Sequence, residues 1–250
     1  MDKHLYNFVL HLGDNALILG HRLSEICGHG PALEQDMAVT NIALDLVGQS
    51  RNLFQLAAQL KGGDATEDSL AYLRDATGYK NVLLAEQKNG DFAKTIVRQF
   101  FYDAFNYHCY QRLLQSKHKD IAAIADKAIK EITYHLKWSS EWVIRLGDGT
   151  EESLRRINDA IEDLWPYTGE MFKFADYEVA CNESGVFPNI QGIKADWDEE
   201  VSSVFGLAGL EVPKDTWMHD GGKRGVHSEH LGFLLAEMQF LQRAYPGQEW

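Results

Sequence analysis

One apolar stripe constrains the fold of this 250-residue chain more than any other feature. Between residues 121 and 146, apolar or small side chains recur every three or four positions, as on one face of an α-helix. The stripe consists of Ile121, Ala125, Ala128, Ile132, Leu136, Ser139, Val143 and Leu146. The same periodicity runs through most of the chain, with only five prolines and almost no strand-like alternation. The sequence therefore predicts an almost entirely helical protein.

Turn and capping residues divide this pattern into helices. We expect helices over residues 5–27, 31–60, 66–74, 92–116, 121–146, from 150 onward with a kink or split at Pro166, over 194–207 and over 227–245. Such lengths are typical of an all-α bundle. We expect a single domain over residues 1–250, with a core bundle over about 3–147 and C-terminal helices over about 150–250.

Composition excludes several classes of function. A net charge of −13 disfavours binding to nucleic acid or to an anionic membrane, because both need clustered lysine and arginine. No segment has the ~18 consecutive apolar residues of a membrane span, so the cytoplasm is the expected location. The three cysteines, Cys27, Cys109 and Cys181, form no CxxC pair, which argues against a zinc site or a disulfide framework.

The stripe also carries an incomplete metal-binding motif. Helix bundles that hold two irons place a Glu and a His three residues apart on an inward face. His135 has Ile132 at i−3, and its nearest carboxylate, Glu131, lies at i−4. On a helical wheel, Ile132 lies about 20° from the centre of the stripe, His135 about 40° and Glu131 about 80°. A hydrocarbon therefore takes the inward position that a carboxylate ligand would need.

Polar residues recur at helical spacing on the four long helices. They are Asp14, His21 and Glu25, then Asn41, Asp45, Gln49 and Asn52, then Gln99, Asp103 and Asn106, and finally His135. Two explanations compete. A metal site would use Glu25, Asp45, Asp103 and His135, whereas a metal-free network would combine the same acids with the amides and with Arg22, Arg51 or Arg98. Because asparagine and glutamine are not typical iron ligands, we favour the network.

Two features near the C-terminus are less specific. His227, Glu229 and His230 could suggest a metal cluster, although this spacing at a helix start is more often a capped, solvated turn. The glycine-rich loop 221–225 contains Lys223 and Arg224, which make it a candidate anion-binding or partner-docking loop. It lacks the preceding strand and the spacing of a P-loop.

Several segments together resemble a known family. They are LGDNALILGHRLSEICGHGP, NIALDLVGQSRN, AIKEITYHLKWSSEWVIRLGDGT, GGKRGVHSEHLG and LAEMQFLQRAYPGQEW. They closely resemble the C subunit of the bacterial multicomponent phenylacetyl-CoA epoxidases, or ring 1,2-monooxygenases, from Leu12 to Trp250. The resemblance implies a ferritin-like bundle that is not catalytic. It also implies a homologous catalytic partner that carries the di-iron site, epoxidises phenylacetyl-CoA in aerobic phenylacetate catabolism, and receives electrons from NADPH through a reductase subunit.

The resemblance also implies a degenerate di-iron site. Laid on this chain, the family's ligand pattern is retained at Glu25, Asp45, Asp103 and His135, and is replaced at Leu46, Gln49 and Ile132. We therefore expect no metal and no cofactor in this chain, and a di-iron centre in the partner.

Three hypotheses about function follow. The leading one is a structural subunit of a phenylacetyl-CoA epoxidase, which stabilises the catalytic subunit. The alternative is a di-iron oxygenase that is active in its own right with shifted ligands, namely Glu25, Asp45, Asp103, Glu131 and His135. The third is a stand-alone acyl-CoA binding module, which rests only on Lys223 and Arg224.

Overall fold

The computed structural model describes residues 1–214 and 217–248, so the last two residues of the resembling C-terminal segment, Glu249 and Trp250, lie outside the described residues. The elements are α1 (Lys3–Ser24), α2 (Leu33–Lys61), α3 (Glu67–Tyr72), η1 (Ala76–Gly78), α4 (Phe92–Leu113), α5 (Lys119–Gly147), α6 (Glu151–Leu164), η2 (Trp165–Tyr167), η3 (Gly169–Phe172), α7 (Asp176–Glu183), η4 (Ile190–Gly192), α8 (Ile193–Ala208), η5 (Gly222–Arg224), α9 (Glu229–Met238) and α10 (Phe240–Ala244). No strand occurs in the described ranges. The prediction of an all-α protein is confirmed.

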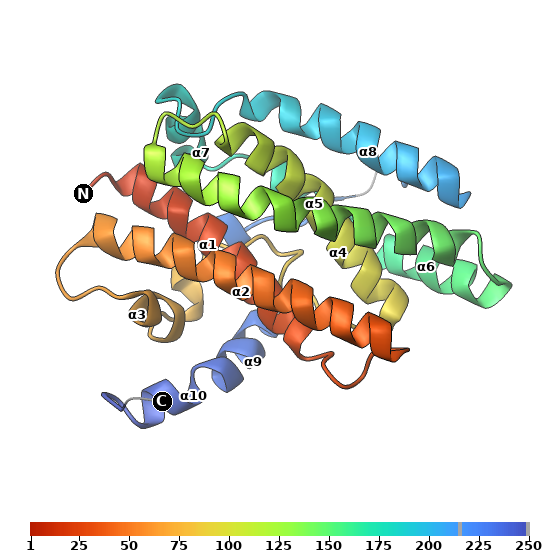
Figure 1. Cartoon of the computed structure of the whole chain (residues 1–250), viewed down its shortest axis with the longest axis horizontal. Helices are drawn as coiled ribbons and strands as arrows, with labels where there is room; N and C mark the ends of the chain where they lie inside the picture. The colour runs from red at the N-terminus through yellow and green to blue at the C-terminus, as the bar shows by residue number, and fades with distance from the viewer. Residues whose placement is uncertain (215–216, 249–250) are drawn as a thin grey trace.

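The four long helices form the centre of the molecule (Figure 1). Helix α1 packs along α2 and α4 packs along α5, while α2 also contacts α5. Helices α6 and α8 cover α4 and α5 on one side, and α9 and α10 lie on the side of α2 away from α8 (Figure 1). This arrangement is consistent with a ferritin-like bundle. The division into a core bundle and C-terminal helices within one domain stays a prediction.

Helix ends follow the capping residues in the sequence. The Asp2 carboxylate accepts from the backbone N–H of His4 at the start of α1, and Asp91 accepts from Lys94 N–H at the start of α4. Thr150 and Ser153 form a reciprocal capping box at the start of α6. Helix α6 ends at Leu164, directly before the 3-10 turn that contains Pro166, so the predicted split occurs.

Two parts of the helix prediction are wrong. The region predicted as one helix over 227–245 is two helices, α9 and α10, separated at Gln239. Its first two residues are not helical, because the His227 side chain and the Ser228 N–H both bind the Glu86 carboxylate. Of the helix expected after Pro166, only α7 is α-helical, and its first turn is held by the Glu178 carboxylate, which accepts from Ala175 N–H at 2.7 Å.

The stripe on α5 forms part of the core. All of its members except Leu146 are buried, and Ile132 is fully buried. Each large apolar side chain of this kind contributes on the order of 1.5–3 kcal/mol when its apolar surface leaves water. No helix among the described residues is both long and apolar enough to cross a membrane.

Candidate functional site

Polar side chains from α2, α4 and α5 meet between these helices, and three of them, Gln49, Asp103 and His135, are buried. His135 on α5 is fully buried, and its Nε2 lies 3.0 Å from Oδ2 of Asp45 on α2. Asp103 on α4 is 1% exposed and accepts hydrogen bonds from Ser139 Oγ at 2.8 Å and from Gln99 Nε2 at 2.7 Å. We call Asp45, Gln49, Asp103, Glu131 and His135 the central polar site.

The carboxyl group of Asp103 has a pKa well above that of an ordinary aspartate. Its burial raises its pKa to about 7, although the charge of His135 and the hydrogen bonds from Ser139 and Gln99 oppose the rise. Near neutral pH this carboxyl therefore exchanges between its ionised and protonated forms. A carboxylate that bridges two irons would instead be held in its ionised form by the metal charge.

Apolar groups fill two of the positions at which the resemblance implies lost ligands. Leu46 and Ile132 are both fully buried. At the third position, Gln49 is 2% exposed, and its Nε2 donates to Oε2 of Glu131 at 2.9 Å. Glu131 therefore serves as an acceptor for an amide on the neighbouring helix.

These residues do not fit a pair of irons. A di-iron site in such a bundle needs a carboxylate from each of two helices and a Glu and His from each of the other two. Within the described ranges, no group of three or more His, Cys, Asp and Glu side chains is arranged to hold a metal ion. The acceptor oxygens of Asp103 already face a hydroxyl and an amide, and the His135 Nε2 faces Asp45.

Glu25 lies apart from the central polar site. It is the residue that ends α1, and its side chain is 39% exposed. Its carboxylate accepts from Arg22 at 2.6 Å and from Asn89 at 3.0 Å. The expectation that Glu25 points into the bundle beside Asp103 and His135 is therefore wrong, because its side chain pairs with Arg22 and Asn89 at the exposed end of α1.

Other members of the predicted polar set are also distributed differently. Asn41 and Arg51 are exposed on α2, so neither joins an internal network. Arg98 is fully buried, and it donates to the backbone carbonyl of Gln87 and to Oδ1 of Asn89 at the end of the bundle. Asp14 is fully buried and pairs with Arg74, a cation that the sequence pattern does not single out.

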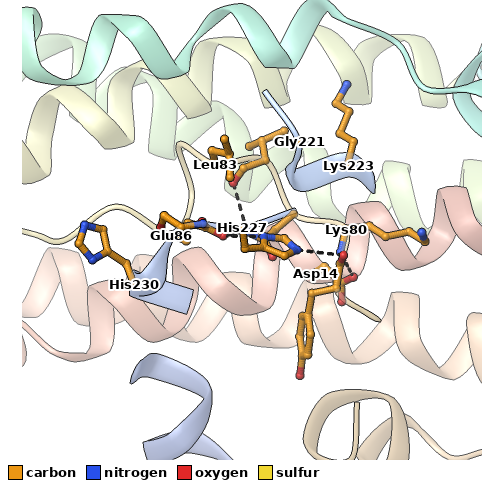
Figure 2. A network of polar contacts seen from close by, with 12 residues as sticks. Asp14, Lys80, Leu83, Glu86, Gly221, Lys223, His227 and His230 are labelled. Carbon is orange, nitrogen blue, oxygen red and sulfur yellow. Dashed lines mark hydrogen bonds and ion pairs between the residues drawn. The ribbon is translucent and has the colours of Figure 1, made fainter. Parts of the chain in front are cut away.

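Sequence reasoning missed a second polar centre, formed by three buried carboxylates, Glu86, Glu170 and Glu178, which we call the carboxylate cluster. Glu86 binds the side chain of His227 and the backbone of Ser228, and it lies beside the C-terminal segment in Figure 2. Glu170 accepts from the backbone N–H groups of Leu83 at 2.7 Å and Gly221 at 2.8 Å. Through these hydrogen bonds, the carboxylate cluster connects the segment 221–228 to the loop before α4.

Lys223 belongs to this cluster and not to an anion site. It is 3% exposed, and its Nζ lies 3.0 Å from both carboxylate oxygens of Glu178 and 3.1 Å from the carbonyl of Met171. Arg224 is exposed but pairs with Asp220 at 3.0 Å. The prediction of an anion-binding loop on these two cations is wrong, because one is buried in an internal ion pair and the other is paired at the surface.

The glycines of loop 221–225 have a packing role. A Cβ at Gly222 would lie 2.2 Å from the backbone oxygen of Asn81, and one at Gly225 would lie 2.3 Å from that of Thr77. Gly225 also has a φ of 81°, which favours glycine. The spacing of these glycines is compatible with phosphate binding and with close backbone packing, so the sequence alone does not distinguish the two.

The residues proposed as a minor metal candidate are also separated. The His227 side chain is 4% exposed, with Nδ1 2.8 Å from Glu86 and Nε2 3.1 Å from the carbonyl of Tyr79. Burial alone would lower the pKa of His227, but the hydrogen bond and the charge of Glu86 outweigh it, so that its pKa is raised. Glu229 is exposed. The expected solvated turn is wrong for His227, which is a buried partner of Glu86.

The fold and the central polar site define a class of protein: an all-α bundle of ferritin-like type whose centre is an Asp–His–amide network. The family model "Phenylacetic acid catabolic protein" matches residues 1–250, and the chain belongs to that family. It is 47% identical over 243 residues to the C subunit of the 1,2-phenylacetyl-CoA epoxidase of Escherichia coli (strain K12), an alignment that covers 97% of this chain and 98% of that protein.

Proposed function

We propose that this chain is the structural, non-catalytic subunit of a multicomponent phenylacetyl-CoA epoxidase. In this role it pairs with a homologous catalytic subunit, which carries the di-iron site, and stabilises it. The similarity to the C subunit of the E. coli epoxidase supports the assignment to phenylacetate catabolism. The reductase and the other subunits of such a system are further partners under this proposal, and the cytoplasm is its location.

One observation carries the non-catalytic part of the proposal. Ile132 is fully buried at the position where a fourth-helix carboxylate would have to reach the metal, and Leu46 is fully buried on the neighbouring α2. Two hydrocarbon side chains at the centre supply no donor atoms for Fe(II), which needs carboxylate and imidazole ligands. Of the donor atoms that remain, His135 Nε2 faces Asp45, and both Asp103 oxygens accept hydrogen bonds from Gln99 and Ser139.

Metal analysis tests this proposal directly. The protein is expressed with added iron, purified without chelator, and analysed by inductively coupled plasma mass spectrometry. We expect well under one iron per ten chains. Near-stoichiometric iron, together with an oxo-bridge absorption band and turnover of phenylacetyl-CoA by this chain alone, would instead establish the alternative of an active di-iron oxygenase.

Co-purification tests the pairing part. The chain is co-expressed with the homologous di-iron subunit of the same system, with an affinity tag on one chain only, and the complex is sized by light scattering. A stoichiometric heteromeric complex is expected. A stable monomer that ignores the tagged homologue would contradict the proposal.

A further inference from the structure

The outward side of α2 is markedly poor in charge, whereas most of the exposed positions of the neighbouring α5 are charged. The exposed large apolar side chains of α2 are Leu33, Met37, Leu44 and Val47, at 71%, 56%, 64% and 39% exposure, and Tyr134 on the neighbouring α5 is 48% exposed. We call these five residues the α2–α5 outer face. The four α2 residues recur at i, i+4, i+11 and i+14, so they lie on one side of the helix.

A comparison with α6 shows that this composition is not that of an ordinary solvated face. Between residues 35 and 50, the exposed positions of α2 are Met37, Asn41, Leu44, Val47 and Gly48, and none of them is charged. The exposed positions of α6 are mostly charged: Glu151, Glu152, Arg155, Arg156, Asp159, Glu162 and Asp163. A contiguous uncharged surface over about three turns of helix is the usual mark of a protein interface.

A small pocket opens in this face between the two helices. Its volume is about 110 Å³, and its lining includes Leu44, Asp45, Gly48 and Gln49 of α2 and Lys127 and Glu131 of α5. Within the part of the chain that the structure describes, Oε1 of Gln49 is buried and has no hydrogen-bond partner. An unpaired buried acceptor costs about 1–3 kcal/mol, so a donor that enters the pocket would recover this energy.

The charges at the pocket favour a cationic donor. Two carboxylates, Asp45 and Glu131, line it against one exposed lysine, Lys127. A second copy of this chain is a poor occupant, because each copy carries a net charge of −13 and the two would repel. A lysine or arginine on an apolar helix of another subunit satisfies both the pocket and the apolar side of α2 beside it.

The face reaches the size of a stable interface when the mostly charged outer side of α5 is counted as a polar rim beside the apolar side of α2. Helices α2 and α5 each have 29 residues and lie antiparallel, with Trp142 bonded to Gln35 near one end and Glu131 bonded to Gln49 further along. Their joint outer surface, about 43 Å long and about 20 Å wide, is on the order of 900 Å². A standard interface buries about 800 Å² per partner.

We infer that the α2–α5 outer face is the surface that docks the catalytic subunit, through an apolar helix of that subunit which inserts one lysine or arginine beside Glu131. This inference rests on the proposed function, since it names the surface on which the proposed partner binds. Figure 1 shows α2 and α5 side by side on the face toward the viewer, with α8 on the far side of α5.

Matched substitutions on two helices test the surface. Leu44→Asp and Gly48→Glu alter the α2–α5 outer face, and Leu207→Asp and Gly206→Glu make the same changes on α8. Leu44 and Leu207 are 64% and 68% exposed, and a Cβ at Gly48 or Gly206 meets no atom within 4 Å. All four variants should therefore keep the melting temperature of the wild type to within a few degrees.

Binding of each purified variant to the tagged di-iron subunit is measured by biolayer interferometry. We expect Leu44→Asp and Gly48→Glu to raise Kd about tenfold or more, and the α8 variants to leave it unchanged. Glu131→Gln tests the inserted cation: it should weaken the complex and flatten its dependence on salt concentration.

The outcomes separate this inference from the proposed function. If the wild type binds and all four surface variants bind equally well, the docking surface is wrong and the pairing stands. If the wild type does not bind, the proposed function itself fails. If Leu44→Asp only converts a homodimer of this chain into a monomer, the face joins two copies and the inference is overturned. If the Kd of Glu131→Gln depends on salt concentration as steeply as that of the wild type, no cation of the partner is inserted beside Glu131.

Discussion

Replacing Asp103 with asparagine should stabilise the protein in a way that depends on pH. The carboxyl group of Asp103 has a pKa of about 7 in the folded protein, against 3.8 for an ordinary aspartate, because it is buried in the bundle. The folded state therefore binds more protons at this group than the unfolded state does between about pH 4 and pH 7. Stability must fall as the pH rises through that window, and the loss is complete above the folded pKa.

The magnitude follows from the difference between the two pKa values. A difference of about three, at about 1.4 kcal/mol per pH unit, corresponds to on the order of 4 kcal/mol above pH 7. At pH 5 the folded group is already protonated and only about 1.5 kcal/mol of the cost is present. The introduced asparagine would carry no charge and could keep both hydrogen bonds. Ser139 Oγ would donate to Oδ1 of the new asparagine. The Gln99 amide would rotate, so that Gln99 Oε1, which has no hydrogen-bond partner among the described residues, accepts from Nδ2 of the asparagine.

Thermal unfolding of both proteins at pH 5 and pH 8, followed by circular dichroism, measures the effect. The gain in stability of Asp103→Asn should be about 2.5 kcal/mol larger at pH 8 than at pH 5, which corresponds to roughly 5–10 °C in Tm for a chain of this size. Asp126→Asn, at an exposed aspartate of α5, is the control and should change little at either pH. A gain in stability that is equal at the two pH values, or a loss of stability that grows with pH, would refute the raised pKa of the Asp103 carboxyl.

Two further predictions concern loop 221–225 and its carboxylate partner. Lys223→Met should destabilise the protein by about 3–5 kcal/mol, because it leaves the Glu178 carboxylate buried without its cation. Arg224→Met, at the exposed neighbour, should change the free energy of unfolding by less than about 0.5 kcal/mol. Chemical denaturation measures both variants, and equal effects would show that the buried ion pair does not stabilise the protein. Gly222→Ala should lower Tm because its Cβ would lie 2.2 Å from a backbone oxygen, while Gly206→Ala on α8 has open space and should raise stability by about 0.5–1 kcal/mol. Similar melting curves for the two alanine variants would contradict the close approach.

Local patterns were sufficient for most of the helices. The boundaries of α4 and α6 follow from Asp91 and Thr150, whose side chains accept from backbone N–H groups that are close in sequence. The inward position of Ile132 follows from the period of the α5 stripe alone. Such features depend on interactions within one or two helical turns, which is why the sequence alone predicts them.

Errors arise where a small local difference has a large spatial effect. The sequence predicts that α1 continues to Cys27, but the helix ends at Ser24, and the Glu25 side chain pairs with Arg22 and Asn89 at this exposed end. Loop 221–225 differs from its prediction for another reason. Glycines that permit phosphate binding and glycines that permit backbone packing have the same pattern, and only the position of the Asn81 carbonyl distinguishes them.

The sequence by itself determined that the chain is a bundle of long helices, with a histidine at its centre and a hydrocarbon where a metal ligand would stand. Only the tertiary structure decided how the buried charges are partnered. His135 meets Asp45 across 90 residues of chain, and Lys223 meets Glu178 across 45. The strength of such pairs depends on distance and on exclusion from water, and both are properties of the packed bundle, which no local pattern encodes.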